Sequence, residues 1–309
     1  MVRYFVGRLL SAGVVIAGVA VIVFLLIHIV PGDPVEVMLG ESARPADREA
    51  LRRALGLDQP ILMQLGRYLE GIAQLDLGSS FHSKRQITDL LAERVPATFQ
   101  LAAAALLIAI ILGVPLGTLA AMRRGTAWDF VTMGVSMVGV SVPNFVMGPL
   151  LILFFSVWLG WFPVSGREGA LAIVLPALTL GTAMAAILAR MVRSSLLEVI
   201  QEDFIRTARA KGLSERQVVW GHALPNAALP VITVIGLQLG TLLGGAVITE
   251  IVFSWPGIGQ LTIEAIQRRD YPVLQACVLL ICLAYVMVNT LTDLVYAALD
   301  PRIRLEAAP

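Results

Sequence analysis

Residues 203–225, which read DFIRTARAKGLSERQVVWGHALP, join two apolar stretches of the chain. The three-to-four spacing in the first eight residues predicts an amphipathic helix. Its apolar side is formed by Phe204, Ile205 and Ala208, and its basic side by Arg206 and Arg209. A helix this short is marginal in water unless its apolar side packs against something. We therefore interpret residues 203–225 as a docking segment, and we keep this name below.

The rest of the docking segment carries signals for a turn and a second helix. Gly212 stands where a helix commonly ends in a left-handed residue. Ser214 is followed three residues later by Gln217, the spacing of a capping box in which each side chain satisfies a free backbone donor. Leu224 and Pro225 are expected to close this second helix.

The docking segment resembles the EAA loop of bacterial ABC importer permeases. That loop has the pattern Glu-Ala-Ala, three residues, Gly, nine residues and Ile-x-Leu-Pro. The corresponding residues here are Arg206-Thr207-Ala208, Gly212 and His222-Ala223-Leu224-Pro225. The spacing is kept, but Arg206 stands in place of the glutamate and His222 in place of the isoleucine.

These departures are compatible with the peptide, opine and nickel branch of that family, which other landmarks also resemble. In chain order they are RLL near the N-terminus, PGDP (31–34), LGLDQP (55–60), EIVFSWPGIG (250–259), RDYP (269–272) and DPRIR (300–304). The resemblance therefore covers nearly the whole chain.

Composition independently predicts an all-α polytopic membrane protein. Of the 309 residues, 57% are hydrophobic and 15% charged, against roughly 45–50% apolar and 25% charged in soluble domains. Mean hydropathy is +0.81. A helix needs about 20 apolar residues to cross the hydrocarbon of a bilayer. Six segments fit: about 9–30, 98–122, 131–158, 171–191, 228–249 and 275–297.

Basic residues in the short loops predict that both termini are cytosolic. The residues on the predicted cytosolic side are Arg3, Arg8, Arg123 and Arg124, followed by Arg190, Arg193, Arg206, Arg209, Lys211, Arg216, Arg302 and Arg304. The opposite short loops hold Arg167, Arg268 and Arg269. This topology places the docking segment in the cytosol.

Three regions are expected along the chain. Residues 1–30 form a retained anchor helix, because the apolar run exceeds a signal-peptide core and lacks a convincing cleavage site. Residues 31–97 form an extracytoplasmic insertion with short helices at 47–55 and 61–73 and a turn at 78–80. It is either part of a binding surface or a solvated lid. Residues 98–309 form the core permease domain, with the coupling loop at about 193–227.

After the fifth span, the chain is too polar to cross a membrane again. Family resemblance implies that it borders the outer mouth of the translocation path; the candidate residues are Glu250, Phe253, Trp255, Pro256 and Gly257. Trp255 is expected in the interfacial belt of the membrane, and a simple interfacial anchor is the alternative. In the fifth span, Gly236, Gly240, Gly244 and Gly245 predict close helix packing, within the chain or with a second permease.

Several kinds of chemistry are not predicted. The two lysines, Lys84 and Lys211, are not in a phosphate-binding Walker A motif, so the chain is not expected to be an ATPase. The three histidines lie in different regions, and no spacing typical of a metal site or a bound cofactor occurs. Cys277 and Cys282 are read as inert thiols. The dispersed basic residues argue against nucleic-acid binding.

The resemblance implies a permease subunit of type I fold in the bacterial inner membrane, importing di- or oligopeptides or related solutes such as glutathione or a nickel complex. Implied partners are a second permease, two ABC ATPases that bind ATP and Mg²⁺, and an extracytoplasmic solute-binding protein. We expect the apolar side of the first docking helix to insert into the ATPase, with Arg206 and Arg209 meeting acidic groups at its rim. The competing classes are a stand-alone secondary transporter or channel, and a membrane-embedded assembly protein.

Overall fold

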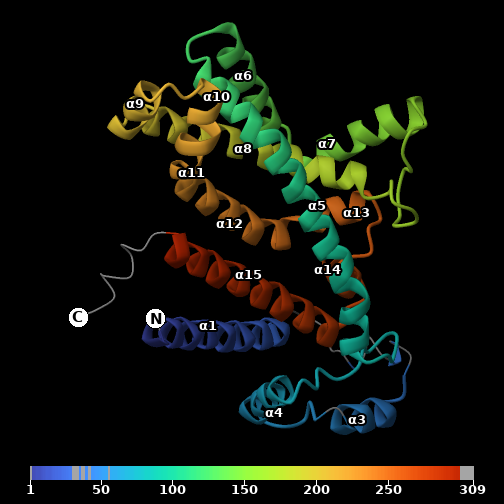
Figure 1. The fold of residues 1–309 in the computed structure, drawn as a ribbon. Coiled ribbons are helices and arrows are strands. Elements are labelled where there is room, and N and C mark those ends of the chain that lie inside the picture. The colour runs from blue at the N-terminus through green and yellow to red at the C-terminus, as the bar shows by residue number, and fades with distance from the viewer. Residues whose placement is uncertain (1, 30–34, 36–38, 41–42, 55, 300–309) are drawn as a thin grey trace. The chain divides into compact units, whose positions relative to one another are not determined.

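The computed structural model describes residues 2–29, 35, 39–40, 43–54 and 56–299 (Figure 1). Its described elements are helices, apart from one isolated antiparallel bridge between Ser79 and Gln86. The all-helical class predicted from the sequence is thus confirmed for this part of the chain. The landmarks at 31–34 and 300–304 lie outside the described residues.

The chain divides into two compact units. Unit 1 comprises Met1–Ala97 and Pro256–Val286, and unit 2 comprises Thr98–Trp255 and Met287–Pro309. Two long helices, α5 (Ile87–Met122) and α15 (Tyr271–Leu299), contribute to both units. Each unit is described here by itself.

Unit 1 holds the predicted insertion. Its other helices are α1 (Val2–Ile29), α3 (Pro45–Ala54), α4 (Ile61–Ala73) and α14 (Ile258–Gln267). Helices α3 and α4 match the two that were predicted in the insertion. Helix α5 begins at Ile87, inside the predicted insertion, and continues without a break into the second predicted span.

A buried carboxylate ties the turn of the insertion to the start of α15. Asp270 is 4% exposed. It accepts hydrogen bonds from the Ser80 hydroxyl and from the backbone N–H groups of Phe81 (3.1 Å) and His82 (3.2 Å). Nearby, Ile87 of α5 and Ile258 of α14 share one apolar core. This end of the insertion is therefore packed against its own chain rather than solvated on all sides.

Unit 2 is built around α8 (Val174–Val199), which contacts α6, α7, α12 and α13. The remaining elements are α6 (Ala127–Ser141), α7 (Asn144–Leu151), the π-helix η1 (Ile152–Trp158), α9 (Asp203–Ala210), α10 (Glu215–Val218), the π-helix η2 (Val219–Ala223), α11 (Leu224–Asn226), α12 (Ala228–Gly245) and α13 (Val247–Val252). Small residues let α5 approach α8. A Cβ on Gly113 would lie 2.9 Å from the Ala185 carbonyl oxygen, and one on Gly117 would collide with the carbonyl oxygen of Ala189.

In length and composition, α5, α8 and α15 are each able to cross a membrane. Two bent helix pairs would raise the number of candidate spans among the described residues to five, and α1 contains a shorter apolar stretch, Leu10–Leu25. The count of six spans stays a prediction.

The third predicted span, 131–158, is bent rather than one continuous helix, and the bent pair remains a candidate span. Helix α6 ends at Ser141, and the helix that starts at Asn144 is turned by 103° from it. Val142 is extended, with φ −85° and ψ 115°. A residue before proline is disfavoured in the helical conformation because the proline ring clashes with its backbone, and Pro143 therefore explains the break.

Candidate functional site

The first helix of the docking segment, α9, runs from Asp203 to Ala210, as predicted. Lys211 caps its end, and Gly212 follows with φ +82°. A Cβ at Gly212 would meet no atom within 4 Å. Glycine is therefore favoured here by the left-handed backbone and not by lack of space.

The apolar side of α9 is divided between the protein core and the surface. Ile205 is 0% exposed and Ala208 6% exposed, and both pack in a core with Leu196 of α8 and Val218 of α10. The expectation that these two side chains insert into a partner is wrong. The sequence pattern identified an apolar stripe but not the surface that covers it, and that surface belongs to this chain.

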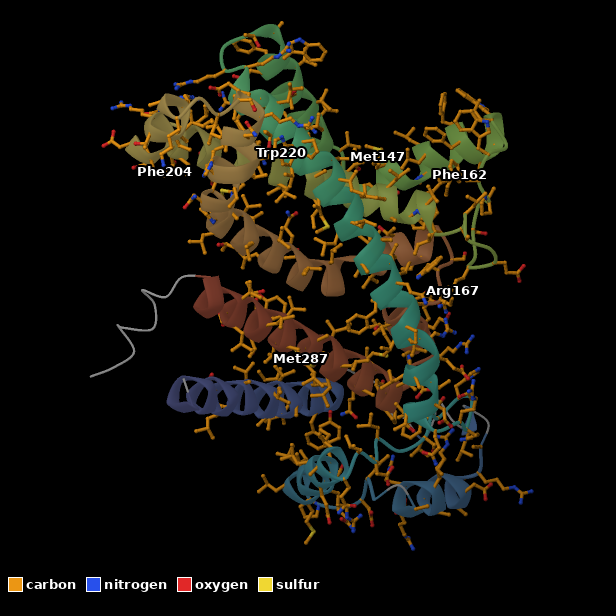
Figure 2. The ribbon with its side chains drawn as sticks, viewed as in Figure 1. Met147, Phe162, Arg167, Phe204, Trp220 and Met287 are labelled. Atoms are coloured by element: carbon orange, nitrogen blue, oxygen red, sulfur yellow. The ribbon has the colours of Figure 1, made fainter. Side chains whose placement is uncertain are left out.

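Two aromatic side chains remain on the outside of the docking segment. Phe204 on α9 is 41% exposed, and Trp220 in η2 is 49% exposed (Figure 2). Trp220 also lines a shallow open hollow with Leu213, Arg216, Gln217, Gly221 and His222. The sequence analysis did not name Trp220 as a candidate. Its neighbours Val218 and Val219 are buried because the second helix packs inward, and Trp220 lies on the exposed side of the same turn.

The basic residues of α9 have carboxylate partners within the segment. The Arg206 Nη1 lies 3.1 Å from Asp203 Oδ1. Arg209 makes two contacts with Glu215, at 2.7 Å from Nε and 3.2 Å from Nη2. The Arg209–Glu215 pair spans the turn at Gly212 and joins α9 to α10. Exposed pairs of this kind contribute roughly 0–1 kcal/mol, so they are readily exchanged for carboxylates of another protein.

The second helix begins with the predicted capping box. The Gln217 N–H donates to Ser214 Oγ at 3.4 Å, and the Ser214 N–H donates to Gln217 Oε1 at 3.0 Å. The helical run from Glu215 ends at Asn226, one residue after Pro225, and the next helix is turned by 59° from it, so the predicted end of the second helix is confirmed to within a residue. The chain widens into η2 and then forms α11, with Pro225 in its first turn. Proline is tolerated in a first turn, where its missing N–H would have no helical partner.

The outer-mouth candidates fall in both units. In unit 2, Glu250 is fully buried and accepts a hydrogen bond from the Thr98 hydroxyl at 2.7 Å. Phe253 and Trp255 are each 2% exposed, and the Arg167 guanidinium lies over the Trp255 ring at 5.8 Å. Trp255 is thus buried in protein and is not the exposed interfacial residue that was predicted.

Pro256 and Gly257 belong to unit 1, where Gly257 precedes the first turn of α14. Among the described residues, the structure has no group of three or more His, Cys, Asp or Glu side chains that could hold a metal ion.

Comparison with known protein families gives two matches. Residues 113–305 match the family described as binding-protein-dependent transport system inner membrane component. Residues 1–102 match the N-terminal part of such membrane components.

Two relatives are similar over almost the whole chain. The chain is 45% identical over 304 residues to the glutathione transport system permease protein GsiC of Pectobacterium atrosepticum, covering 98% of this chain and 99% of that protein. It is 43% identical to the protein of the same name in Escherichia coli, with the same coverage.

Solved structures share the fold at lower identity. The MetNI methionine ABC transporter in an inward-facing conformation has a TM-score of 0.59 at 21% identity, covering 68% of this chain and 96% of that chain. An amino acid ABC transporter has a TM-score of 0.53 at 16% identity, covering 67% and 92%.

Proposed function

This chain belongs to the family of binding-protein-dependent transport system inner membrane components, and from that premise we propose that it forms half of the translocation pathway of an ATP-driven importer. It is a permease subunit. The similarity to glutathione permeases over 98% of the chain is the observation that carries the choice of solute. We propose glutathione or another short peptide.

The complex that we propose has five subunits, counting this chain. A second homologous permease completes the pathway, two ABC ATPases bind ATP and Mg²⁺, and an extracytoplasmic binding protein delivers the solute. With both termini in the cytosol, the docking segment faces the ATPases. Glu250, Phe253, Trp255, Pro256 and Gly257 border the outer mouth. ATP-driven closure of the ATPases displaces the docking segments and switches the permeases between inward-open and outward-open arrangements.

In this proposal, Phe204 and Trp220 are the anchors of the ATPase interface. Aromatic residues, Phe included, are enriched at protein interfaces, and Trp is among the residues that most often dominate the binding energy. Ile205 and Ala208 hold α9 from the inside, so that a push on the exposed side reaches the core of unit 2. Arg206, Thr207 and Arg209 form the polar rim.

Gly212 and the Leu224–Pro225 step set the path of the chain through the docking segment. At Gly212, a residue with a Cβ would be strained in the left-handed conformation and would turn α10 away from its position. Leu224 packs at the edge of an apolar core with Leu188 and Val192 of α8. The end of the docking segment, just before α12, therefore packs against α8, the helix that precedes the segment.

The decisive experiment is a mild-detergent pull-down of the tagged chain, coexpressed with its neighbouring genes, combined with glutathione uptake. We expect Gly212→Asp and the double variant Phe204→Ala/Trp220→Ala to insert normally, to lose the ATPases and to abolish uptake. The control is Gly160→Asp, at an exposed glycine of the same unit with φ +66° and equally open surroundings. Normal uptake with bound ATPases in both docking variants would overturn the assignment of this segment.

The competing stand-alone carrier predicts a different result. Such a protein would be recovered without ATPases from the wild type as well, and a gradient of ions alone would drive its uptake. Family membership favours the importer.

A further inference from the structure

Helix α6 is polar on its inner side and apolar on its outer side. Its buried residues are Asp129, Thr132 and Ser136, at spacings of three and four that define one face. The exposed side is made of large apolar residues: Trp128, Phe130, Val131, Val135, Met137 and Val138. This distribution suits a helix that faces lipid outward and packs on α8 through small polar groups.

Helices α6 and α8 approach closely at a pair of small residues. A Cβ on Gly139 would lie 3.3 Å from the Cβ of Ala186. The two buried hydroxyls bond back to their own helix: Thr132 Oγ1 donates to the Trp128 carbonyl at 2.7 Å, and Ser136 Oγ donates to the Thr132 carbonyl at 2.9 Å. These groups therefore do not fix how far α6 is shifted along α8.

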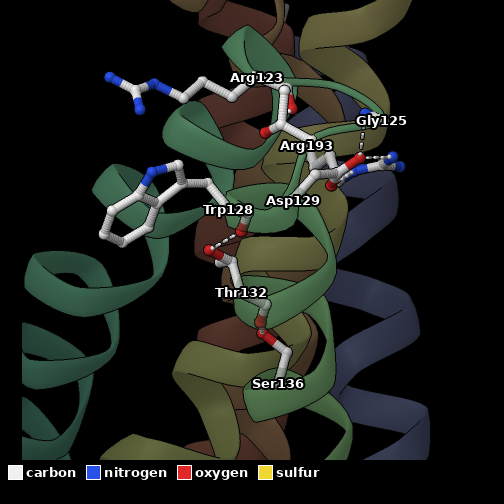
Figure 3. Close-up of polar contacts among 8 residues, drawn as sticks. Arg123, Gly125, Trp128, Asp129, Thr132, Ser136 and Arg193 are labelled. Atoms are coloured by element: carbon white, nitrogen blue, oxygen red, sulfur yellow. Dashed lines mark hydrogen bonds and ion pairs between the residues drawn. The ribbon is translucent and has the colours of Figure 1, made fainter.

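One ion pair does join the two helices (Figure 3). Arg193 of α8 donates to Asp129 through Nε at 2.7 Å and Nη2 at 2.8 Å. The Gly125 N–H donates to the same carboxylate at 3.0 Å, and Gly125 has φ +76° in the turn between α5 and α6. A two-pronged guanidinium–carboxylate contact has directional specificity as well as attraction. Among the described residues, this pair is the one polar side-chain link between α6 and α8.

Within unit 2, the pair lies between the docking segment and α6. Arg193 precedes Asp203 by ten residues, and α8 runs most of that distance. One turn after Arg193, Leu196 is fully buried in the core that also holds Ile205 of α9. A displacement of α9 is therefore passed to the end of α8, where Arg193 connects it to α6.

We propose that Arg193 and Asp129 are a positioning pair that fixes the register of α6 on α8 and transmits movement of the docking segment to α6. The register is a property of this chain alone. The transmission rests on the function proposed above.

The first test measures the register by disulfide formation. In a chain with Cys277→Ala and Cys282→Ala, the pair Gly139→Cys and Ala186→Cys places two Cβ atoms close to the separation required for a disulfide. We expect a high yield of oxidised product in isolated membranes. Asp129→Asn should lower that yield severalfold, and Arg190→Gln, at an exposed arginine of the same helix, should not.

Removing Arg193 alone can also impair folding, because it leaves the buried Asp129 carboxylate without its charge partner. The double variant Asp129→Asn/Arg193→Gln avoids this by removing both charges while keeping groups that can hydrogen bond. An unchanged disulfide yield in this double variant would overturn the proposed role in register, whatever the complex turns out to be.

The second test uses the whole complex in liposomes and compares solute moved with ATP hydrolysed. We expect the double variant to retain its ATPases but to move on the order of tenfold less solute per ATP, within the usual range for coupling between sites. An unchanged ratio would overturn the transmission role. Loss of the ATPases from the wild-type chain would instead refute the proposed function, and the disulfide result would remain valid.

Discussion

At the scale of single residues, the structure is most informative where charge is buried. Three carboxylates among the described residues are buried: Asp129, Glu250 and Asp270. Each accepts at least one hydrogen bond from a group distant in the sequence or in a neighbouring turn. A buried charge without such partners would be strongly unfavourable. Each of these residues therefore links separate segments of the chain through hydrogen bonds.

Asp270 provides the prediction at this scale. Asp270→Ala leaves the Ser80 hydroxyl and the N–H groups of Phe81 and His82 without their acceptor, which should cost about 1–3 kcal/mol per buried unsatisfied group, less where water enters. We expect a lower midpoint in thermal unfolding in detergent and faster proteolysis around residues 80–86. Asp58→Ala, at an exposed carboxylate of the insertion, is the control. Equal unfolding midpoints for the two variants would refute a fastening role for Asp270.

At the scale of helices, local signals in the sequence predicted local structure well. The capping box at Ser214 and the glycine at 212 correctly placed the end of α9 and the start of α10, because both depend on backbone groups within a few residues. The same sequence did not show which surface covers Ile205, or that Trp255 is buried. Those outcomes depend on residues far along the chain, and no local pattern encodes them.

Glycine packing also separates what a local pattern predicts from what distant residues decide. Gly236 does lie against Thr292 of the same chain, which confirms close packing at that position of the predicted series. The approach of α5 to α8 at Gly113 and Gly117 was not singled out. A four-residue glycine spacing indicates that some helix can come close, but the partner is decided by the tertiary fold.

The prediction at the scale of helices concerns Gly117, where α5 packs against α8. Gly117→Ala places a methyl group against the carbonyl of Ala189 and the side chain of Val192, so α5 and α8 must separate. Overpacking of this kind typically costs about 1–3 kcal/mol, and we expect a clearly lower unfolding midpoint. Gly134→Ala in α6 meets no atom within 4 Å and should raise the midpoint or leave it unchanged. If both alanines behave alike, the close approach of α5 and α8 is not required for stability.

At the scale of the whole molecule, composition alone predicted the membrane class, and the order of motifs along the chain indicated the family that the comparisons then confirmed. The number of spans was harder to predict, because hydropathy does not report a bend such as that before Pro143. A permease also derives its energy from another subunit, so the function belongs to a complex.

The last prediction concerns whether the energy for transport comes from separate ATPase subunits. Reconstituted alone in liposomes, the chain should not accumulate glutathione under a proton or sodium gradient, because half of the pathway and the ATPases are missing. Reconstituted with its second permease, ATPases and binding protein, it should accumulate glutathione only when ATP and Mg²⁺ are on the side of the ATPases. A complex with a substitution in the ATPase Walker A lysine controls for leakage and should behave as if ATP were absent. Gradient-driven accumulation by the chain alone would refute its dependence on ATPase subunits and would identify the chain as a self-sufficient carrier.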